Sequence, residues 1–231
     1  MSSGTANKDL RTQGIVLHRT NYGETDRILN ILTPEGKIAV LAKAVRRPGS
    51  KLAGGVEMFC LSDITIHRGK GELGILTSAK MLTNYHNILA DLTRLELASQ
   101  AMKAINKATN DVADAEYFEL LKQVLAGLNE GTPSSVVKMW FDINFRRLGG
   151  EEYNFYTDTH GDKLKPGVNY RWNLRENALE PCADGPISTN QIKLMRLMAT
   201  SPLTVVARVK DIENLTKKLV PPAGIEPALY P

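Results

Sequence analysis

The amino-acid sequence predicts an α+β protein, in which a small five-stranded β domain comes first and a helical domain follows. The first observation is a set of five short runs rich in β-branched residues, separated by turn residues, that ends near residue 82. The second is a change of apolar spacing from the two-residue period of strands to the helical period at about residue 88. A chain of 231 residues can form one large domain or two ordinary ones.

The predicted strands cover residues 13–19, 27–33, 36–44, 56–67 and 73–82. In the fourth run, Ile64 and Ile66 alternate with polar residues, so we expect one buried face and one exposed face. Five closely spaced strands with no helical pattern between most of them favour a small antiparallel barrel, although an open meander fits the same pattern. Among such barrels, the five-stranded OB-fold frequently binds nucleic acids.

Two apolar stripes at helical spacing predict the first two helices. The stripes are Leu95, Ala98, Met102 and Ile105, and Phe118, Leu121, Leu125 and Leu128. Thr132 and Pro133 predict the start of a third helix, with threonine as the N-cap and proline as the first helical residue. The glycines at 149–150 predict its end.

The pattern is weaker in the last third of the chain. Residues 151–185 are rich in Asn, Asp, Gly and Tyr, with a short hairpin expected at 168–174. Ser188 begins a capping-box sequence that predicts a helix ending before Pro202, and a final helix is expected over 205–219.

These patterns divide the chain into four predicted parts. They are a flexible tail over 1–12, a barrel domain over 13–82, a helical domain over 88–220 that includes the irregular segment 151–185, and a disordered tail over 221–231. No apolar run reaches the roughly 18 residues of a membrane helix. The chain has only two cysteines, so we expect a cytoplasmic protein without a disulfide framework.

A basic loop, defined as residues 43–51, follows the third predicted strand. Its cations are Lys43, Arg46, Arg47 and Lys51. Such residues can each displace a counterion from a phosphate backbone, although a solvated surface loop fits the same composition. Residues 1–80 hold 12 Lys and Arg against 7 Asp and Glu, and the rest of the chain holds 17 against 18. The positive excess therefore lies in the β domain, as expected for a module that binds an anionic polymer.

Other motifs are less informative. Residues 69–74 match the G-x-G-x-x-G pattern of dinucleotide sites, but a strand pattern follows where that site needs a helix N-terminus. We expect a glycine turn there, with Arg68 and Lys70 adding positive charge. The sequence contains no catalytic motif, so no enzymatic activity is expected. Cys182 and His160 supply at most two of the four ligands of a structural zinc site, so neither a metal nor another cofactor is expected.

Few aromatic residues lie in the β domain. Tyr22, beside Gly23 in a predicted turn, is the candidate for stacking on a base. Phe59 lies in an apolar run and is expected in the core. Binding should therefore depend mainly on charge, with strong salt sensitivity and weak sequence selectivity.

Several stretches occur in the order and spacing of a known family. They are Tyr22-Gly-Glu-Thr-Asp-Arg27, Leu32-Thr-Pro-Glu-Gly-Lys37, Lys43-Ala-Val-Arg-Arg47, Ser50-Lys-Leu-Ala-Gly54 and His67-Arg-Gly-Lys-Gly-Glu-Leu-Gly74. In these stretches the chain resembles the RecO-type recombination mediators, a bacterial DNA repair family. The resemblance covers about residues 13–82 and implies an N-terminal OB-fold barrel followed by an all-α helical domain.

The resemblance also implies a function. Such a mediator binds single- and double-stranded DNA, anneals complementary strands and helps to load the recombinase. Its partners would be RecR and the acidic C-terminal tail of single-strand-binding protein, in the cytoplasm and near the nucleoid. The basic residues that the resemblance assigns to the DNA site are Lys37, Lys43, Arg46, Arg47, Lys51, Arg68 and Lys70.

One departure from the family is plain. Many members carry a four-cysteine zinc module after a Leu-Gly pair like Leu148-Gly149, and here residues 151–185 replace it with Cys182 as the only cysteine. Zinc is therefore expected to be absent. Packing of aromatic residues would hold the segment instead, and the candidates are Tyr153, Phe155, Tyr170 and Trp172.

Two other functions stay open at this point. A protein–protein interaction module would show a shallow salt dependence with DNA and tight binding to an acidic peptide. A general RNA- or single-strand-binding OB protein would be separated by competition between RNA and DNA of equal length.

Overall fold

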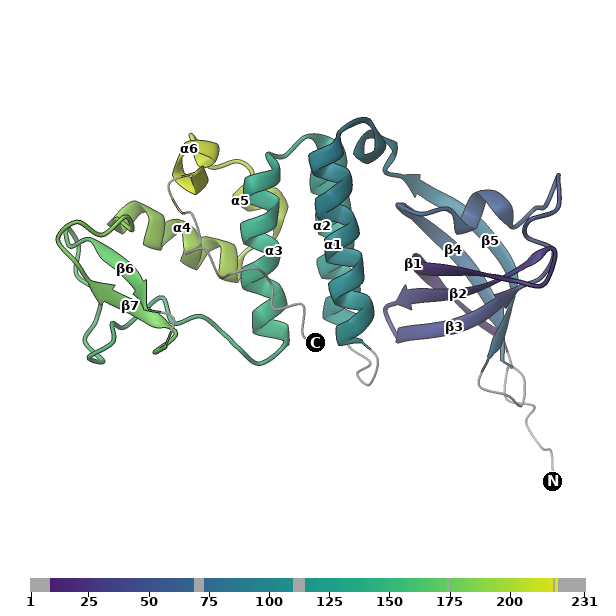
Figure 1. Cartoon of the computed structure of the whole chain (residues 1–231), viewed down its shortest axis with the longest axis horizontal. Coiled ribbons are helices and arrows are strands. Elements are labelled where there is room, and N and C mark those ends of the chain that lie inside the picture. The colour runs from purple at the N-terminus through teal and green to yellow at the C-terminus, as the bar shows by residue number, and fades with distance from the viewer. Residues whose placement is uncertain (1–8, 69–72, 110–114, 174, 218, 220–231) are drawn as a thin grey trace, which may run out of the picture. The chain divides into compact units, whose positions relative to one another are not determined.

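The computed structural model of the chain describes residues 9–68, 73–109, 115–173, 175–217 and 219. It forms two compact units, Met1–Asn129 and Glu130–Pro231, which we call the N-terminal unit and the C-terminal unit. The N-terminal unit contains a β-barrel and two α-helices, and the C-terminal unit contains the remaining helices and a small sheet (Figure 1). The predicted tail over 221–231 lies outside the described residues.

Five strands form a closed barrel in the order β1-β2-β3-β5-β4 (Figure 1). The strands are β1 (Asp9–Tyr22), β2 (Asp26–Thr33), β3 (Gly36–Ala42), β4 (Cys60–His67) and β5 (Gly74–Asn84). Neighbouring strands are antiparallel except β3 and β5, which pair in parallel at Val40↔Gly74 and Leu41↔Ile75. The predicted N-terminal OB-fold barrel is confirmed, and the open meander is excluded.

Strand β1 is long because it pairs with two neighbours. Its first half pairs with β4, starting at Asp9↔His67, and its second half pairs with β2, ending at Tyr22↔Asp26. A register shift between the β1–β2 pairs lets the strand bend around the barrel. The strand starts at Asp9, before the predicted tail boundary at residue 12, and residues 1–8 lie outside the described part of the chain.

Inward-facing apolar side chains fill the barrel, as strand alternation requires. The buried residues of this core are Val16, Leu29, Ile31, Val40, Ala42, Val45, Val56, Ile64, Ile66 and Leu76. Two of them, Val45 and Val56, come from the segment between β3 and β4, which includes the 3-10 helix η1 (Ala53–Val56). This segment is therefore packed onto the barrel core rather than projecting from it.

The N-terminal unit also contains the 3-10 helix η2 (His86–Ala90) and the helices α1 (Leu92–Ala108) and α2 (Ala115–Glu130). The Asp91 side chain caps α1 by accepting the Arg94 N–H at 3.0 Å. Lys37 Nζ donates to the Asn106 carbonyl oxygen at 2.6 Å, which ties the last turn of α1 to β3. The division between units accordingly falls at the end of α2, whereas the sequence predicted a boundary between residues 82 and 88.

The C-terminal unit contains α3 (Ser134–Leu148), β6 (Tyr170–Asn173), β7 (Ala178–Pro181), α4 (Thr189–Thr200), α5 (Leu203–Val206) and α6 (Ile212–Lys217). The N-cap of α3 is Pro133 rather than the predicted Thr132. The capping box that begins at Ser188 is confirmed. The predicted final helix is wrong, because α5 and α6 are separate short helices and the positive φ of 57° at Asp211 interrupts the helical path.

The irregular segment 151–185 contains the antiparallel β6–β7 hairpin, so this unit is not purely helical. The Tyr153 ring lies 5.0 Å from Trp172 in an edge-to-face arrangement and 5.7 Å from Phe155. Tyr170 is fully buried, and its hydroxyl accepts the Lys165 N–H at 2.8 Å. The expected aromatic packing is therefore confirmed. No helix in the described part of the chain is long and apolar enough to cross a membrane.

Candidate nucleic-acid interface

The basic loop 43–51 has a fixed backbone. Val45 is 3% exposed and anchors the loop in the barrel core. The Arg46 N–H donates to the Thr25 carbonyl oxygen at 2.8 Å, which joins the loop to the turn between β1 and β2. Ala44 adopts a φ of 52°, in the left-handed region that residues with a Cβ rarely occupy. A buried anchor and tertiary hydrogen bonds thus hold a locally unfavourable conformation.

The Asp26 carboxylate contributes a second attachment. Its Oδ1 accepts the Ala44 N–H at 2.7 Å and the Thr25 hydroxyl at 3.1 Å. The hydrogen bond from Ala44 lowers the pKa of Asp26 below its usual range, and the nearby Lys43 and Arg47 lower it further. Asp26 therefore stays ionised and accepts these hydrogen bonds at any pH near neutrality.

The loop presents its cations to solvent. The side chains of Lys43, Arg46, Arg47 and Lys51 are exposed, and no ion pair between described residues includes them. Arg46 Nη1 lies 3.4 Å from the Gly23 carbonyl oxygen, to which it donates. Four positive charges thus project from a backbone that is held in one conformation.

Tyr22 lies next to this loop in space, as the hydrogen bond from Arg46 to the adjacent Gly23 requires. The tyrosine side chain is 55% exposed. Gly23 has a φ of 56°, which suits glycine in the tight β1–β2 turn. The structure therefore places the backbone of an exposed aromatic residue next to the basic loop.

Lys37 does not join this group. Its side chain is half-buried, and its ammonium group donates to Asn106 at the end of α1. A lysine near a helix C-terminus satisfies a carbonyl oxygen and is favoured by the helix dipole. Lys37 therefore has a structural contact that explains its position without a phosphate.

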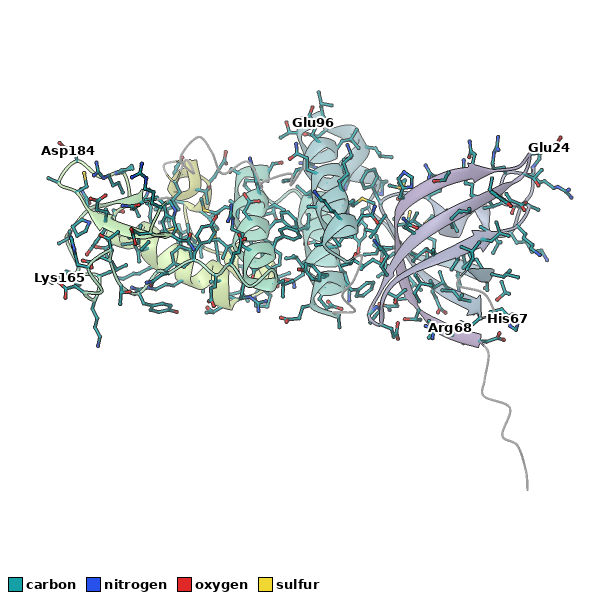
Figure 2. All side chains as sticks on the ribbon, turned by 60° about the horizontal axis from the view of Figure 1, so that its bottom comes forward. Glu24, His67, Arg68, Glu96, Lys165 and Asp184 are labelled. Carbon is teal, nitrogen blue, oxygen red and sulfur yellow. The ribbon has the colours of Figure 1, made fainter. Side chains whose placement is uncertain are left out.

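Arg68 lies apart from the loop. It directly follows His67, the last residue of β4. Figure 2 shows Arg68 and Glu24, which marks the β1–β2 turn, at different corners of the barrel. Arg68 is exposed, and Lys70 lies outside the described residues. The predicted set therefore separates into the loop with Tyr22 and an outlying Arg68.

Sequence reasoning did not identify Asp26 and Thr25 as parts of the site. Both lie in the stretch 22–27, which was noted only for its resemblance to a family. An acidic residue directly after a glycine turn is a recognisable signal for side-chain-to-backbone hydrogen bonding. Its partner Ala44 is 18 residues away, and that pairing appears only in the tertiary structure.

Among the described residues, no group of three or more His, Cys, Asp or Glu side chains is arranged to hold a metal ion. Cys60 is buried and Cys182 is partly buried, and both are free thiols.

Comparison with known proteins agrees with this architecture. Residues 8–85 match the family described as "Recombination protein O N terminal". The DNA repair protein RecO of Dehalococcoides mccartyi is 29% identical over 220 residues, which cover 91% of this chain and 86% of that protein. The DNA repair protein RecO of Acetivibrio thermocellus is 38% identical over 98 residues, which cover 42% of this chain and 39% of that protein.

A solved structure of Entamoeba histolytica asparaginyl-tRNA synthetase overlaps 74% of this chain and 37% of that chain, at 13% identity and a TM-score of 0.29. A similarity at that level carries no argument about fold or function. The family match covers the barrel that bears the basic loop, and the D. mccartyi relative extends through both units. Residues 8–85 of this chain are therefore similar to the recombination protein O N-terminal family, and the chain as a whole resembles the DNA repair protein RecO.

Proposed function

We propose that this protein is a non-enzymatic mediator of DNA repair and recombination that binds single- and double-stranded DNA through the basic loop. One observation carries the proposal: four exposed cations project from a loop whose backbone is fixed against the β1–β2 turn. Exposed cations are available to replace the counterions of a phosphate backbone. A loop that is already ordered loses less conformational entropy on binding. The relationship to DNA repair protein RecO supports the role in repair.

Annealing of complementary strands fits this surface because it requires no catalytic residue. A basic surface screens the repulsion between two phosphate backbones and raises their local concentration. Tyr22 is proposed to stack on a base, an interaction worth about 1–3 kcal/mol for an exposed aromatic ring. Arg68 and Lys70 stay proposed as outlying phosphate contacts.

The finer features of the function rest on the family resemblance. They are assistance in loading the recombinase onto DNA, binding of a RecR-type protein, and binding of the acidic C-terminal tail of single-strand-binding protein. The described residues of this chain carry no marked pocket motif for either protein. These partners are therefore proposed for the chain as a whole rather than for a named surface.

Fluorescence polarisation of a labelled single-stranded oligonucleotide across a salt series tests the proposal. Arg46→Glu/Arg47→Glu should weaken binding severely and flatten its salt dependence, while circular dichroism shows an unchanged fold. Lys163→Glu/Lys165→Glu, which changes two exposed lysines of the C-terminal unit, is the matched control for net charge. Equal affinity of the Arg46/Arg47 variant and the control would remove the basic loop from the proposal.

Competition separates this function from its alternatives. Preference for RNA over DNA of equal length would favour the general OB-type RNA-binding protein. Absence of oligonucleotide binding at low salt, together with tight binding of an acidic peptide, would favour the protein–protein interaction module.

A further inference from the structure

We infer that the Asp26 side chain is a positioning residue, which holds the basic loop in the conformation that presents its cations to DNA. The inference deepens the proposed function and rests on it for the DNA-binding consequence. The conformational part rests on the hydrogen bonds of Asp26 alone. The inference gives Asp26, within the stretch 22–27, a role in DNA binding although this residue does not itself contact a phosphate.

The loop conformation needs an external support at Ala44. Its φ of 52° lies in a region that is disfavoured for residues with a Cβ, so an isolated chain rarely adopts it. The Ala44 N–H donates to Asp26 Oδ1 at 2.7 Å. Two residues further along the loop, the Arg46 N–H donates to the Thr25 carbonyl oxygen at 2.8 Å. Thr25 of the β1–β2 turn and Asp26 at the start of β2 thus hold both sides of the buried Val45 anchor.

The charge of Asp26 has an opposite effect on DNA. Lys43 and Arg47 are close enough to its carboxylate to lower its pKa, so the same charge reduces the positive potential at the loop. Hydrogen bonding by Asp26 therefore favours DNA binding, and its negative charge opposes it. Two substitutions separate these effects, because asparagine keeps an acceptor oxygen for Ala44 and alanine keeps none.

The experiment combines limited trypsin digestion of the full chain with oligonucleotide binding. Mass spectrometry follows cleavage after Lys43, Arg46 and Lys51, which reports loop opening without any DNA. Asp26→Ala should speed this cleavage by about 5-fold, the population change expected for one lost hydrogen bond. Asp26→Asn should leave the cleavage rate within about 2-fold of wild type, since the acceptor is retained.

Oligonucleotide affinity should differ between the two variants. Asp26→Asn should bind DNA about 2- to 5-fold more tightly at 0.1 M salt, because one surface anion is removed. Asp26→Ala should bind more weakly than Asp26→Asn, although both variants change the net charge by the same amount. Glu96→Gln is the charge control, since Glu96 is an exposed residue of α1 that Figure 2 shows away from the β1–β2 turn.

The outcomes distinguish this inference from the proposed function. An unchanged cleavage rate in Asp26→Ala would overturn the positioning role, whatever the DNA affinity. Faster cleavage together with DNA affinity unchanged in Asp26→Ala, Asp26→Asn and Arg46→Glu/Arg47→Glu would support the positioning role and overturn DNA binding by the loop. Equal affinity changes in Asp26→Ala and Asp26→Asn would mean that Asp26 affects DNA binding only through its charge, and would overturn the inference. If Asp26→Ala unfolds, Asp26→Asn still decides, because clearly faster cleavage in this variant, which retains the acceptor for Ala44, would overturn the inference.

Discussion

Replacing Arg46 and Arg47 together with alanine removes half of the exposed cations of the basic loop and preserves its attachments. The attachments of the loop are the buried Val45 side chain and backbone N–H groups, none of which belongs to the two guanidinium groups. Among the described residues, the substitution removes one side-chain hydrogen bond, the long one from Arg46 Nη1 to the Gly23 carbonyl oxygen at 3.4 Å. The substitution therefore changes charge with little change in conformation.

The magnitude follows from counterion release. Each phosphate contact on a single strand contributes about 0.7 to the slope of log K against log salt, so four loop cations give a slope of about −2.8. Loss of two cations should reduce the steepness by about 1.4, which amounts to about 25-fold weaker binding at 0.1 M salt and about 3-fold at 0.5 M. The lines for wild type and variant should converge near 1 M salt.

Fluorescence polarisation at several salt concentrations measures both slopes. Lys163→Ala/Lys165→Ala provides the control, because it removes two exposed lysines of the C-terminal unit. Its slope should stay close to that of wild type. Parallel lines for wild type and the Arg46/Arg47 variant would refute phosphate contact by these arginines, even if the affinity itself fell.

Three further predictions concern stability. Gly55→Ala should lower the free energy of unfolding by about 1–3 kcal/mol, because its Cβ would overlap the Ala79 backbone, and Gly54→Ala, which faces open space, should be nearly neutral in the same urea denaturation. Trp172→Ala should cost about 2–3 kcal/mol by removing the aromatic contacts of segment 151–185, and an unchanged urea midpoint would contradict that role. Burial raises the pKa of Asp142 to about 6, because the buried carboxyl is costly to ionise. The protonated carboxyl therefore favours the folded state fully below about pH 4, and this contribution to the free energy of unfolding is lost as the pH rises through 6. Asp142→Asn should therefore flatten the pH dependence of unfolding between pH 4 and 6 and stabilise the protein at pH 7 by on the order of 2 kcal/mol, and an unchanged pH profile would exclude this effect.

Local patterns in the sequence were sufficient to predict the strands and helices whose own residues show a clear strand or helix signal. Alternation in 56–67 predicted β4, and the capping-box sequence at Ser188 predicted the start of α4. Boundaries were less accurate where distant residues decide them. β1 begins at Asp9 because β4 supplies hydrogen-bond partners there, and the final helix divides near Asp211, whose positive φ is not apparent from the helical period.

The sequence by itself determined the order of strands and helices, the concentration of positive charge in the first 80 residues, and the basic loop with its four cations. Those features depend on residue type and short spacing. Only the tertiary structure decided which cations lie together: it engaged Lys37 with α1, set Arg68 apart from the β1–β2 turn (Figure 2), and joined the loop to Asp26 at the start of β2. The physical reason is that hydrogen bonds between residues far apart in the chain depend on barrel closure, which fixes strand register and leaves no trace in local composition.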